Sequence, residues 1–223
     1  MSLYNDLRQA FPLPHPAGRP FILGGLAAVI LGLVVGWAWI AWLGLAFTLF
    51  CLFFFRDPQR VPPGRPGLIL APADGRVVSV APALPPPELG LGTEPRWRVG
   101  IFLSVLNVHV NRVPAEGTVT RIAYHAGSFV SASLDKASEE NERNAVALRL
   151  PDGRTVAVVQ IAGLIARRIL CTVREGDAVR AGERFGLIRF GSRTDLYLPE
   201  GVKPLVLDGQ TMVGGETVIA ELS

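Results

Sequence analysis

Hydrophobic residues are distributed very unevenly along this chain. From Pro20 to Phe55 no residue is charged, and Gly, Ala, Val, Ile, Leu, Trp and Phe dominate. A single helix of this length would measure about 54 Å, whereas the hydrocarbon core of a bilayer is about 30 Å thick. The pattern therefore predicts two shorter helices, roughly 21–35 and 37–55, with a break at Gly36. Such a pair fits a membrane as a hairpin, or as a re-entrant or tilted interfacial pair.

The charges that flank this apolar segment indicate its orientation. Basic residues lie on both sides of it, and the positive-inside rule then places both flanks in the cytoplasm, which favours a hairpin over one crossing. A cleaved signal peptide is disfavoured, because the run begins near residue 20, is too long and lacks an Ala-x-Ala exit. We expect a cell-membrane protein, peripheral or hairpin-anchored, with its main domain on the cytoplasmic side. The flanking residues are Arg8, Arg19, Arg56, Arg60 and Arg65.

After residue 56 the pattern changes to short β-branched and apolar runs separated by Asp-Gly, Glu-Gly and Pro-Gly pairs. This is typical of a mainly β domain. We therefore predict a leader over 1–19, a membrane-associated helical segment over 20–55, and a β-rich catalytic domain over 56–223. The expected strands are 75–80, 97–103, 117–124, 145–150, 155–162, 184–190, 195–198 and 217–222.

Two segments of the β-rich part resemble each other. Residues 173–183 and 206–216 share the form Val-x-acid-Gly-x-x-apolar-x-x-Gly-Glu. Paired turn-and-strand units of this kind occur in compact barrels, so the repeat favours a barrel-sandwich-like, α+β core. A repeat of this kind indicates a fold and carries no function by itself.

Charge and cysteine content narrow the possible partners. The net charge is +3 and no Lys/Arg-rich run with interleaved aromatic residues is present, so we expect no nucleic-acid partner. Cys51 and Cys171 are far apart in the sequence, which argues against a disulfide framework or a metal cluster. The basic balance suits an anionic membrane surface.

Three residue types of a nucleophilic site are present in the β-rich part. Gly191-Ser192 separates two strand-like runs, Asp74 opens an Asp-Gly pair, and His109 lies in Asn-Val-His-Val-Asn-Arg. A serine hydroxyl needs a base to take its proton, and an acid can orient that base. Each residue also has an ordinary structural interpretation, namely a Gly-Ser turn, an Asp-Gly turn and a packed histidine.

Two chemistries are open to such a triad. A hydrolase would usually carry a Gly-x-Ser-x-Gly elbow, but Ser192 is followed by Arg193. The alternative is attack on the carbonyl of Gly191 in the same chain, because glycine tolerates strained backbone and leaves its carbonyl accessible. An N-to-O shift to an ester, elimination of that ester to dehydroalanine, and hydrolysis of the dehydroalanine would convert Ser192 into a pyruvoyl group on a new N-terminus.

Six motifs follow one another along nearly the whole chain, at 54–58, 71–75, 102–104, 109–114, 135–144 and 190–193. In this order they resemble the short form of the phosphatidylserine decarboxylase family. The resemblance implies a proenzyme that cleaves itself between Gly191 and Ser192, with a pyruvoyl cofactor derived from Ser192. It further implies a Schiff base with phosphatidylserine, release of carbon dioxide and formation of phosphatidylethanolamine. His109 would act as base and acid, and Asp74 mainly in maturation.

The resemblance also raises questions about individual residues. Longer bacterial members carry a second histidine where this chain has Arg112, so the division of work between two histidines does not carry over. The charged block 135–144 is either a solvated loop or short helix, or a lid over a lipid headgroup. Further candidates for substrate contact are His125, Asn144, Arg167 and Arg168, the arginines as partners for phosphate.

Two other classes of function remain open at this point. The chain could be a membrane-anchored adaptor or carrier module of the barrel-sandwich type, although it lacks an attachment lysine in a Met-Lys-Met context. It could also be a membrane-bound serine hydrolase. Expected partners are phosphatidylserine and membrane lipid, the two chains of one precursor, and a second copy of the chain in a homodimer.

Overall fold

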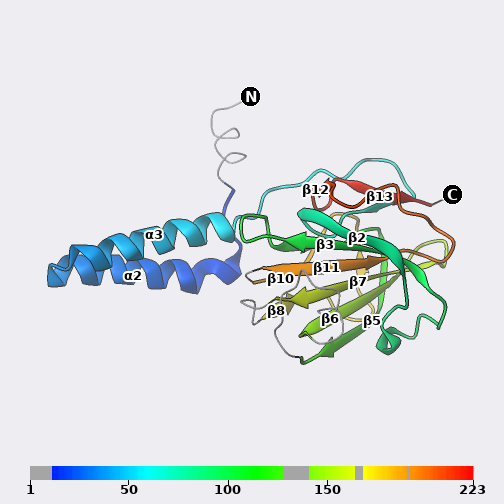
Figure 1. The fold of residues 1–223 in the computed structure, drawn as a ribbon, viewed down its shortest axis with the longest axis horizontal. Coiled ribbons are helices and arrows are strands. Elements are labelled where there is room, and N and C mark those ends of the chain that lie inside the picture. The colour runs from blue at the N-terminus through cyan, green and yellow to red at the C-terminus, as the bar shows by residue number, and fades with distance from the viewer. Residues whose placement is uncertain (1–11, 128–140, 164–167, 190, 223) are drawn as a thin grey trace. The chain divides into compact units, whose positions relative to one another are not determined.

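The computed structural model describes residues 12–127, 141–163, 168–189 and 191–222. Contacts divide the chain into two compact units, Met1–Gln59 and Arg60–Ser223. The first unit is a helical hairpin and the second is built of β-strands, so the mainly β fold with an N-terminal apolar helical segment is confirmed (Figure 1).

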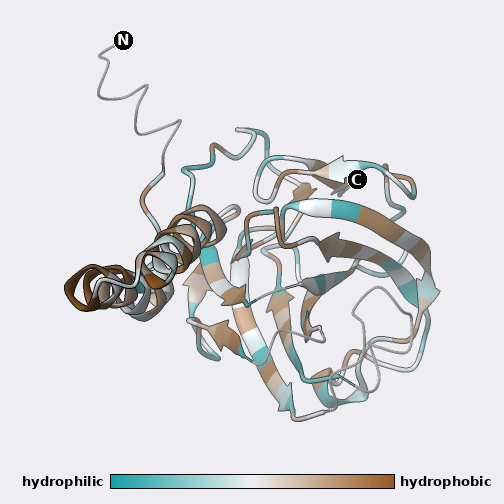
Figure 2. Ribbon diagram, turned by 60° about the vertical axis from the view of Figure 1, so that its left-hand side comes forward, coloured by the Kyte–Doolittle hydropathy of each residue, from teal (hydrophilic) through white to brown (hydrophobic). Residues whose placement is uncertain are grey.

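The hairpin consists of α2 (Arg19–Val35), preceded by the 3-10 turn η1 (Pro16–Gly18), and α3 (Ala38–Phe54). Gly36 ends α2 at a φ of 77°, a left-handed conformation that glycine adopts without steric cost. One helical stretch, Pro16–Val35, is long and apolar enough to cross a membrane, whereas Ala38–Phe54 is shorter. Both helices are coloured hydrophobic along their length in Figure 2.

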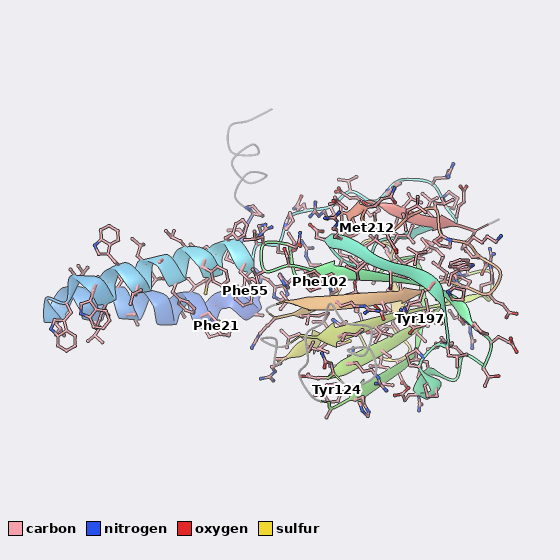
Figure 3. All side chains as sticks on the ribbon, in the orientation of Figure 1. Phe21, Phe55, Phe102, Tyr124, Tyr197 and Met212 are labelled. Carbon is pink, nitrogen blue, oxygen red and sulfur yellow. The ribbon has the colours of Figure 1, made fainter. Side chains whose placement is uncertain are left out.

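Small residues bring α2 and α3 into contact. A Cβ at Gly25 would collide with Thr48, and a Cβ at Gly44 would lie 2.8 Å from the backbone nitrogen of Val29. Close backbone approach of this kind is how helices pack when lipid surrounds them. At the open end of the hairpin Phe21 stacks on Phe55, with ring centroids 5.4 Å apart (Figure 3).

The strands of the second unit form one large and two small sheets. The large sheet has the order β12-β2-β3-β11-β7-β6-β5-β9 and curls into a half-barrel, with β11 between β3 and β7 in Figure 1. Its pairings are antiparallel throughout. The bounds are β2 Gly75–Ala83, β3 Arg96–Leu103, β5 Gly117–His125, β6 Arg143–Arg149, β7 Thr155–Ala162, β9 Ala178–Val179, β11 Ser192–Tyr197 and β12 Thr211–Met212.

The two small sheets have the orders β4-β10-β8 and β1-β13, and the 3-10 turn η2 lies between β2 and β3. Sequence reasoning missed β1, β4 and β8, because each is only three residues long and shows no alternating pattern. The bounds are β1 Leu68–Leu70, η2 Pro87–Leu89, β4 Val110–Arg112, β8 Ile169–Cys171, β10 Arg184–Ile188 and β13 Val218–Glu221.

The two faces of the large sheet bury different clusters. On the inner face of the half-barrel, Leu196, Val158 and Val146 belong to the main apolar core. On the outer face, Tyr197 and Ile161 pack with a second cluster that includes Leu89 of η2. Because side chains alternate along a strand, Ser192 and Thr194 share the inner face with Leu196, whereas Arg193 and Asp195 share the outer face with Tyr197.

The repeated segments adopt matching backbone conformations. Gly176 and Gly209 have φ values of 93° and 87°, and Gly182 and Gly215 have values of 76° and 79°. L-residues rarely adopt these values, so the glycines in the repeat are required by its turns. The sequence repeat is therefore a structural repeat, and its two short strands, β9 and β12, are the two edge strands of the large sheet.

Two expectations from the sequence were wrong in detail. The strand expected at 195–198 begins at Ser192, so the candidate nucleophile lies inside a strand and not in a turn. Residues 135–140 of the charged block lie outside the described part of the chain. The rest of the block, 141–144, is not a solvated loop. Asn141 is fully buried and donates to the carbonyl of Ala162, and β6 begins at Arg143. The lid hypothesis therefore applies only to residues 135–140, which lie outside the described part of the chain.

Candidate active site

Ser192 is the first residue of β11 and pairs with Leu103 of β3 and Ala162 of β7. Its side chain has no exposed surface, and Ser192 Oγ has no hydrogen-bond partner among the described residues. Gly191 precedes it at a φ of 65°, in the left-handed region. A buried hydroxyl without a partner is costly, so it indicates a functional requirement beside a backbone that only glycine adopts freely.

His109 lies immediately before β4 and is 1% exposed. Its Nδ1 is 3.0 Å from the carbonyl oxygen of Asn107. A carbonyl only accepts, so in the neutral ring Nδ1 carries the proton and Nε2 is the basic nitrogen. The backbone N–H of Ile188 donates to the carbonyl of His109 at 3.3 Å, which ties the histidine to the end of β10. The chain then continues through Gly191 to Ser192.

Asp74 lies at the end of a segment that is bonded to β4. Backbone bonds from Leu70 N to Pro114 O and from Arg112 N to Pro72 O run antiparallel, at 2.7 and 2.8 Å. The segment that leads to Asp74 is thereby bonded to β4, the strand that follows His109, and Asp74 itself lies in a bend directly before β2.

The carboxylate of Asp74 has two described partners. Its Oδ2 accepts from Arg60 at 2.6 Å and its Oδ1 accepts from the backbone N–H of Gly214 at 2.8 Å. Gly75, the next residue, packs against the backbone of Phe102, which lies opposite Arg193 in the sheet. Asp74 thus directly precedes β2, whereas His109 directly precedes β4 and Ser192 begins β11. The described contacts of Asp74 hold it to Arg60 and Gly214.

A matched family model and curated relatives agree with this arrangement. The family model described as phosphatidylserine decarboxylase matches residues 47–220. The chain is 73% identical over its full length to a phosphatidylserine decarboxylase proenzyme of Granulibacter bethesdensis, covering 91% of that protein. It is 65% identical to the proenzyme of Gluconacetobacter diazotrophicus and 64% identical to that of Gluconobacter oxydans, over the full length of both chains in each case.

The chain belongs to the phosphatidylserine decarboxylase family. It is accordingly an enzyme of phosphatidylserine metabolism, and the resemblance that its motifs indicated is confirmed.

In this member of the phosphatidylserine decarboxylase family, sequence reasoning missed a buried row of amides. Asn144 donates to Gln160 Oε1 and Gln160 donates to Asn111 Oδ1, both at 2.8 Å. Gln160 lies opposite Thr194 of β11. The signal was present in the sequence, because Gln160 interrupts an otherwise apolar run over 156–162. Asn144 had been a candidate for substrate contact, and it lies at the start of this row.

The outer face of β11 carries a buried ion pair that sequence reasoning also missed. Arg193 binds Asp195 through two bonds, Nε to Oδ1 at 2.6 Å and Nη2 to Oδ2 at 3.0 Å. Both side chains are 1% exposed, and Arg98 lies 3.9 Å from Asp195. Burial, reinforced by the charge of Asp195, raises the pKa of Tyr197 to about 12.

The remaining substrate candidates lie in different surroundings. His125 is exposed and pairs with Arg143 on the outer face, away from the side chain of Ser192. Arg168 is exposed, and its carbonyl accepts from the backbone N–H of Arg189 at 3.3 Å. Burial, and then the charge of Arg168, lower the pKa of Arg189, so the guanidinium groups of Arg168 and Arg189 lie near each other. Arg167 lies outside the described residues.

Proposed function

We propose that the chain cleaves itself between Gly191 and Ser192, converts Ser192 into a pyruvoyl group, and then decarboxylates phosphatidylserine to phosphatidylethanolamine. The observation that carries the proposal is the hydroxyl of Ser192, fully buried and without a partner among the described residues, next to a glycine in a left-handed conformation. A hydroxyl without exposed surface suits attack on its own chain better than attack on an external ester.

The cleavage requires one base and a sequence of balanced steps. His109 Nε2 takes the proton of Ser192 Oγ, which attacks the carbonyl carbon of Gly191; the C–N bond breaks, and the nitrogen of residue 192 accepts a proton. Loss of the α-proton expels the Gly191 carboxylate and leaves dehydroalanine. Water then converts dehydroalanine into a pyruvoyl group and ammonia. Asp74, fixed by Arg60 and Gly214, contributes negative charge near β4 during maturation.

The residues around position 192 suit such a group. A pyruvoyl carbonyl supplies an electron sink for the pair released when carbon dioxide leaves the serine headgroup. Leu103 and Ala162, fully buried on either side of position 192, exclude water from it. His109 donates the proton that replaces the carboxylate on the substrate carbon. Arg168 and Arg189 supply positive charge for the lipid phosphate.

The apolar hairpin gives the enzyme access to a lipid that stays in its bilayer. Trp37, Trp39 and Trp42 are exposed near the turn between α2 and α3, and tryptophan is favoured at membrane interfaces. Each helix of 17 residues measures about 25 Å, close to the hydrocarbon thickness. We propose that the hairpin attaches the enzyme to the cell membrane, with the catalytic domain on the cytoplasmic side.

The cleavage is tested by the intact mass of the purified full-length chain under denaturing conditions. We expect two chains, 1–191 and 192–223, the second beginning with a pyruvoyl group. Ser192→Ala should give one unmodified chain, and the matched control Ser79→Ala, on β2 of the same sheet, should cleave normally. A single chain in the correctly folded wild type would overturn the proposed function.

The base is tested by a pair of histidine variants. His109→Asn should abolish cleavage, because no described group replaces the basic Nε2 beside the end of β10. His125→Asn is the matched control, since that ring is exposed on the outer face, and it should leave cleavage unchanged. Normal cleavage in His109→Asn would assign the base to another group.

A further inference from the structure

The amide row on the inner face has a defined direction. Asn144 donates to Gln160, and Gln160 donates to Asn111, so the oxygen of Asn111 is already engaged. The nitrogen of Gln160 also donates to the carbonyl of Leu170 at 3.4 Å, and because a carbonyl only accepts, Gln160 keeps its nitrogen toward Asn111 and Asn111 keeps its oxygen toward Gln160. The row therefore ends in a donor.

That donor is not alone. Asn111 Nδ2 and Thr194 Oγ1 both have no hydrogen-bond partner among the described residues, and both side chains are fully buried. Thr194 lies directly opposite Gln160 in the sheet, where Cβ atoms are about 5 Å apart, and Gln160 also contacts Asn111. Two buried donors around one glutamine indicate a missing acceptor, because such groups in native proteins are normally satisfied.

The position of these donors indicates which acceptor is missing. Thr194 follows Ser192 by two residues on the same face, a distance of about 7 Å. Beyond Thr194 the face continues to Leu196 and Val158 in the apolar core, so this side of the site is closed. A group bound here must be near the headgroup amine, whereas the phosphate has to lead outward to the acyl chains.

We propose that Asn111 Nδ2 and Thr194 Oγ1 bind the carboxylate of the serine headgroup. The inference rests on the proposed function, because it places the headgroup amine at position 192. Both donors are neutral, so they orient the carboxylate without the counter-charge that would stabilise it most strongly in the ground state. Such an arrangement favours loss of the carboxylate over its retention.

The test compares two lipids that differ only in the carboxylate. Thr194→Val removes the hydroxyl at nearly constant volume, and kcat and KM are measured for phosphatidylserine in mixed micelles. The same preparations are inhibited with phosphatidylethanolamine, which has the amine and the phosphate but no carboxylate. We expect KM for phosphatidylserine to rise about tenfold, the loss of one hydrogen bond to a charged group, and the inhibition constant of phosphatidylethanolamine to stay unchanged.

A second readout does not depend on turnover. Phosphatidylethanolamine is trapped on the small chain of Thr194→Val by reduction, and the adduct is detected by its mass. The lipid concentration that gives half-maximal trapping should equal that of the wild type.

Asn111→Asp keeps an acceptor for Gln160 but presents negative charge to the headgroup, so KM for phosphatidylserine should rise further than in Thr194→Val. Thr194→Ser should restore the wild-type KM. Thr120→Val, which removes a hydroxyl bonded to Ala147 on the same sheet, is the matched control.

The results separate the possible roles. If Thr194→Val weakened the binding of both lipids equally, the hydroxyl would contact the phosphate or the amine, and the carboxylate site would be overturned. Slower self-cleavage with an unchanged KM in the cleaved fraction would assign the donors to maturation and overturn it as well. A wild-type chain that never cleaves would overturn the proposed function itself, which the mass of the untreated protein shows before any variant is made.

Discussion

At the scale of residues, Arg193 and Asp195 show that the two faces of β11 have different roles. Their side chains alternate with Ser192 and Thr194, so the ion pair is buried on one face of β11 while the candidate chemistry lies on the other. Arg98 of the neighbouring β3 lies 3.9 Å from Asp195, so the buried charges on the outer face help to hold β11, and with it residue 192, against β3. Under the proposed cleavage, this arrangement would keep the new N-terminus in register.

Removing one partner of this pair should destabilise the protein strongly. Asp195→Ala leaves Arg193 buried without its counter-charge, at an expected cost of about 3–5 kcal/mol. Asp152→Ala is the matched control, because it breaks a surface pair with Arg154 and should leave the melting temperature unchanged. The melting temperature of the full-length chain in detergent measures both, and equal values would show that the buried pair does not anchor β11.

The buried Tyr197 gives the fold a dependence on alkaline pH. Its pKa is raised to about 12, from about 10 in an unfolded chain, mainly because burial disfavours the phenolate. The stability that this tyrosine contributes is therefore complete below pH 10 and is lost as the pH rises to about 12. Between these pH values the melting temperature of Tyr197→Phe should fall less with rising pH than that of the wild type. An identical fall in both proteins would assign the effect to other groups.

At the scale of elements, two adjacent glycines of α2 have opposite surroundings. A Cβ at Gly25 would collide with Thr48 of α3, whereas a Cβ at Gly24 would meet nothing within 4 Å. The run of apolar residues predicted both helices from the sequence, and the break at Gly36 was correct. Which glycines face the partner helix was not predictable, because nearly every position of the run is apolar.

The two glycines offer a matched pair for testing the hairpin. Gly25→Leu should separate α2 from α3 and accelerate amide hydrogen exchange in both helices, measured by mass spectrometry in lipid nanodiscs. Gly24→Leu adds the same side chain on an open surface and should leave exchange near the wild-type rate. Similar exchange in the two variants would mean that the helices do not depend on each other.

At the scale of the whole molecule, the hairpin surface decides attachment to a membrane. Ile30 and Leu49 are 62% and 57% exposed on α2 and α3. Replacing both by Arg should weaken binding to lipid vesicles by at least a hundredfold, since each charge costs about 2.5–3.5 kcal/mol inside a bilayer. Flotation with vesicles measures the bound fraction.

The control for that prediction carries the same charges elsewhere. Leu205 and Leu207 are 64% and 70% exposed in the β-strand unit, and replacing both by Arg should leave flotation unchanged. Loss of binding in the control alone would place the membrane contact on the β-strand unit, and loss in both would indicate an effect of net charge.

The sequence by itself determined the apolar hairpin, the mainly β domain, the repeated glycine turns and the family, because these depend on local periodicity, on backbone conformations that only glycine adopts easily, and on short motifs. Only the tertiary structure decided that Ser192 lies inside β11, that Asp74 contacts Arg60 and Gly214, and that Asn111, Gln160 and Thr194 meet on one face. These contacts join residues from strands that are distant in the sequence. They depend on how the sheet curls and on the register of each pair, and no local pattern records either.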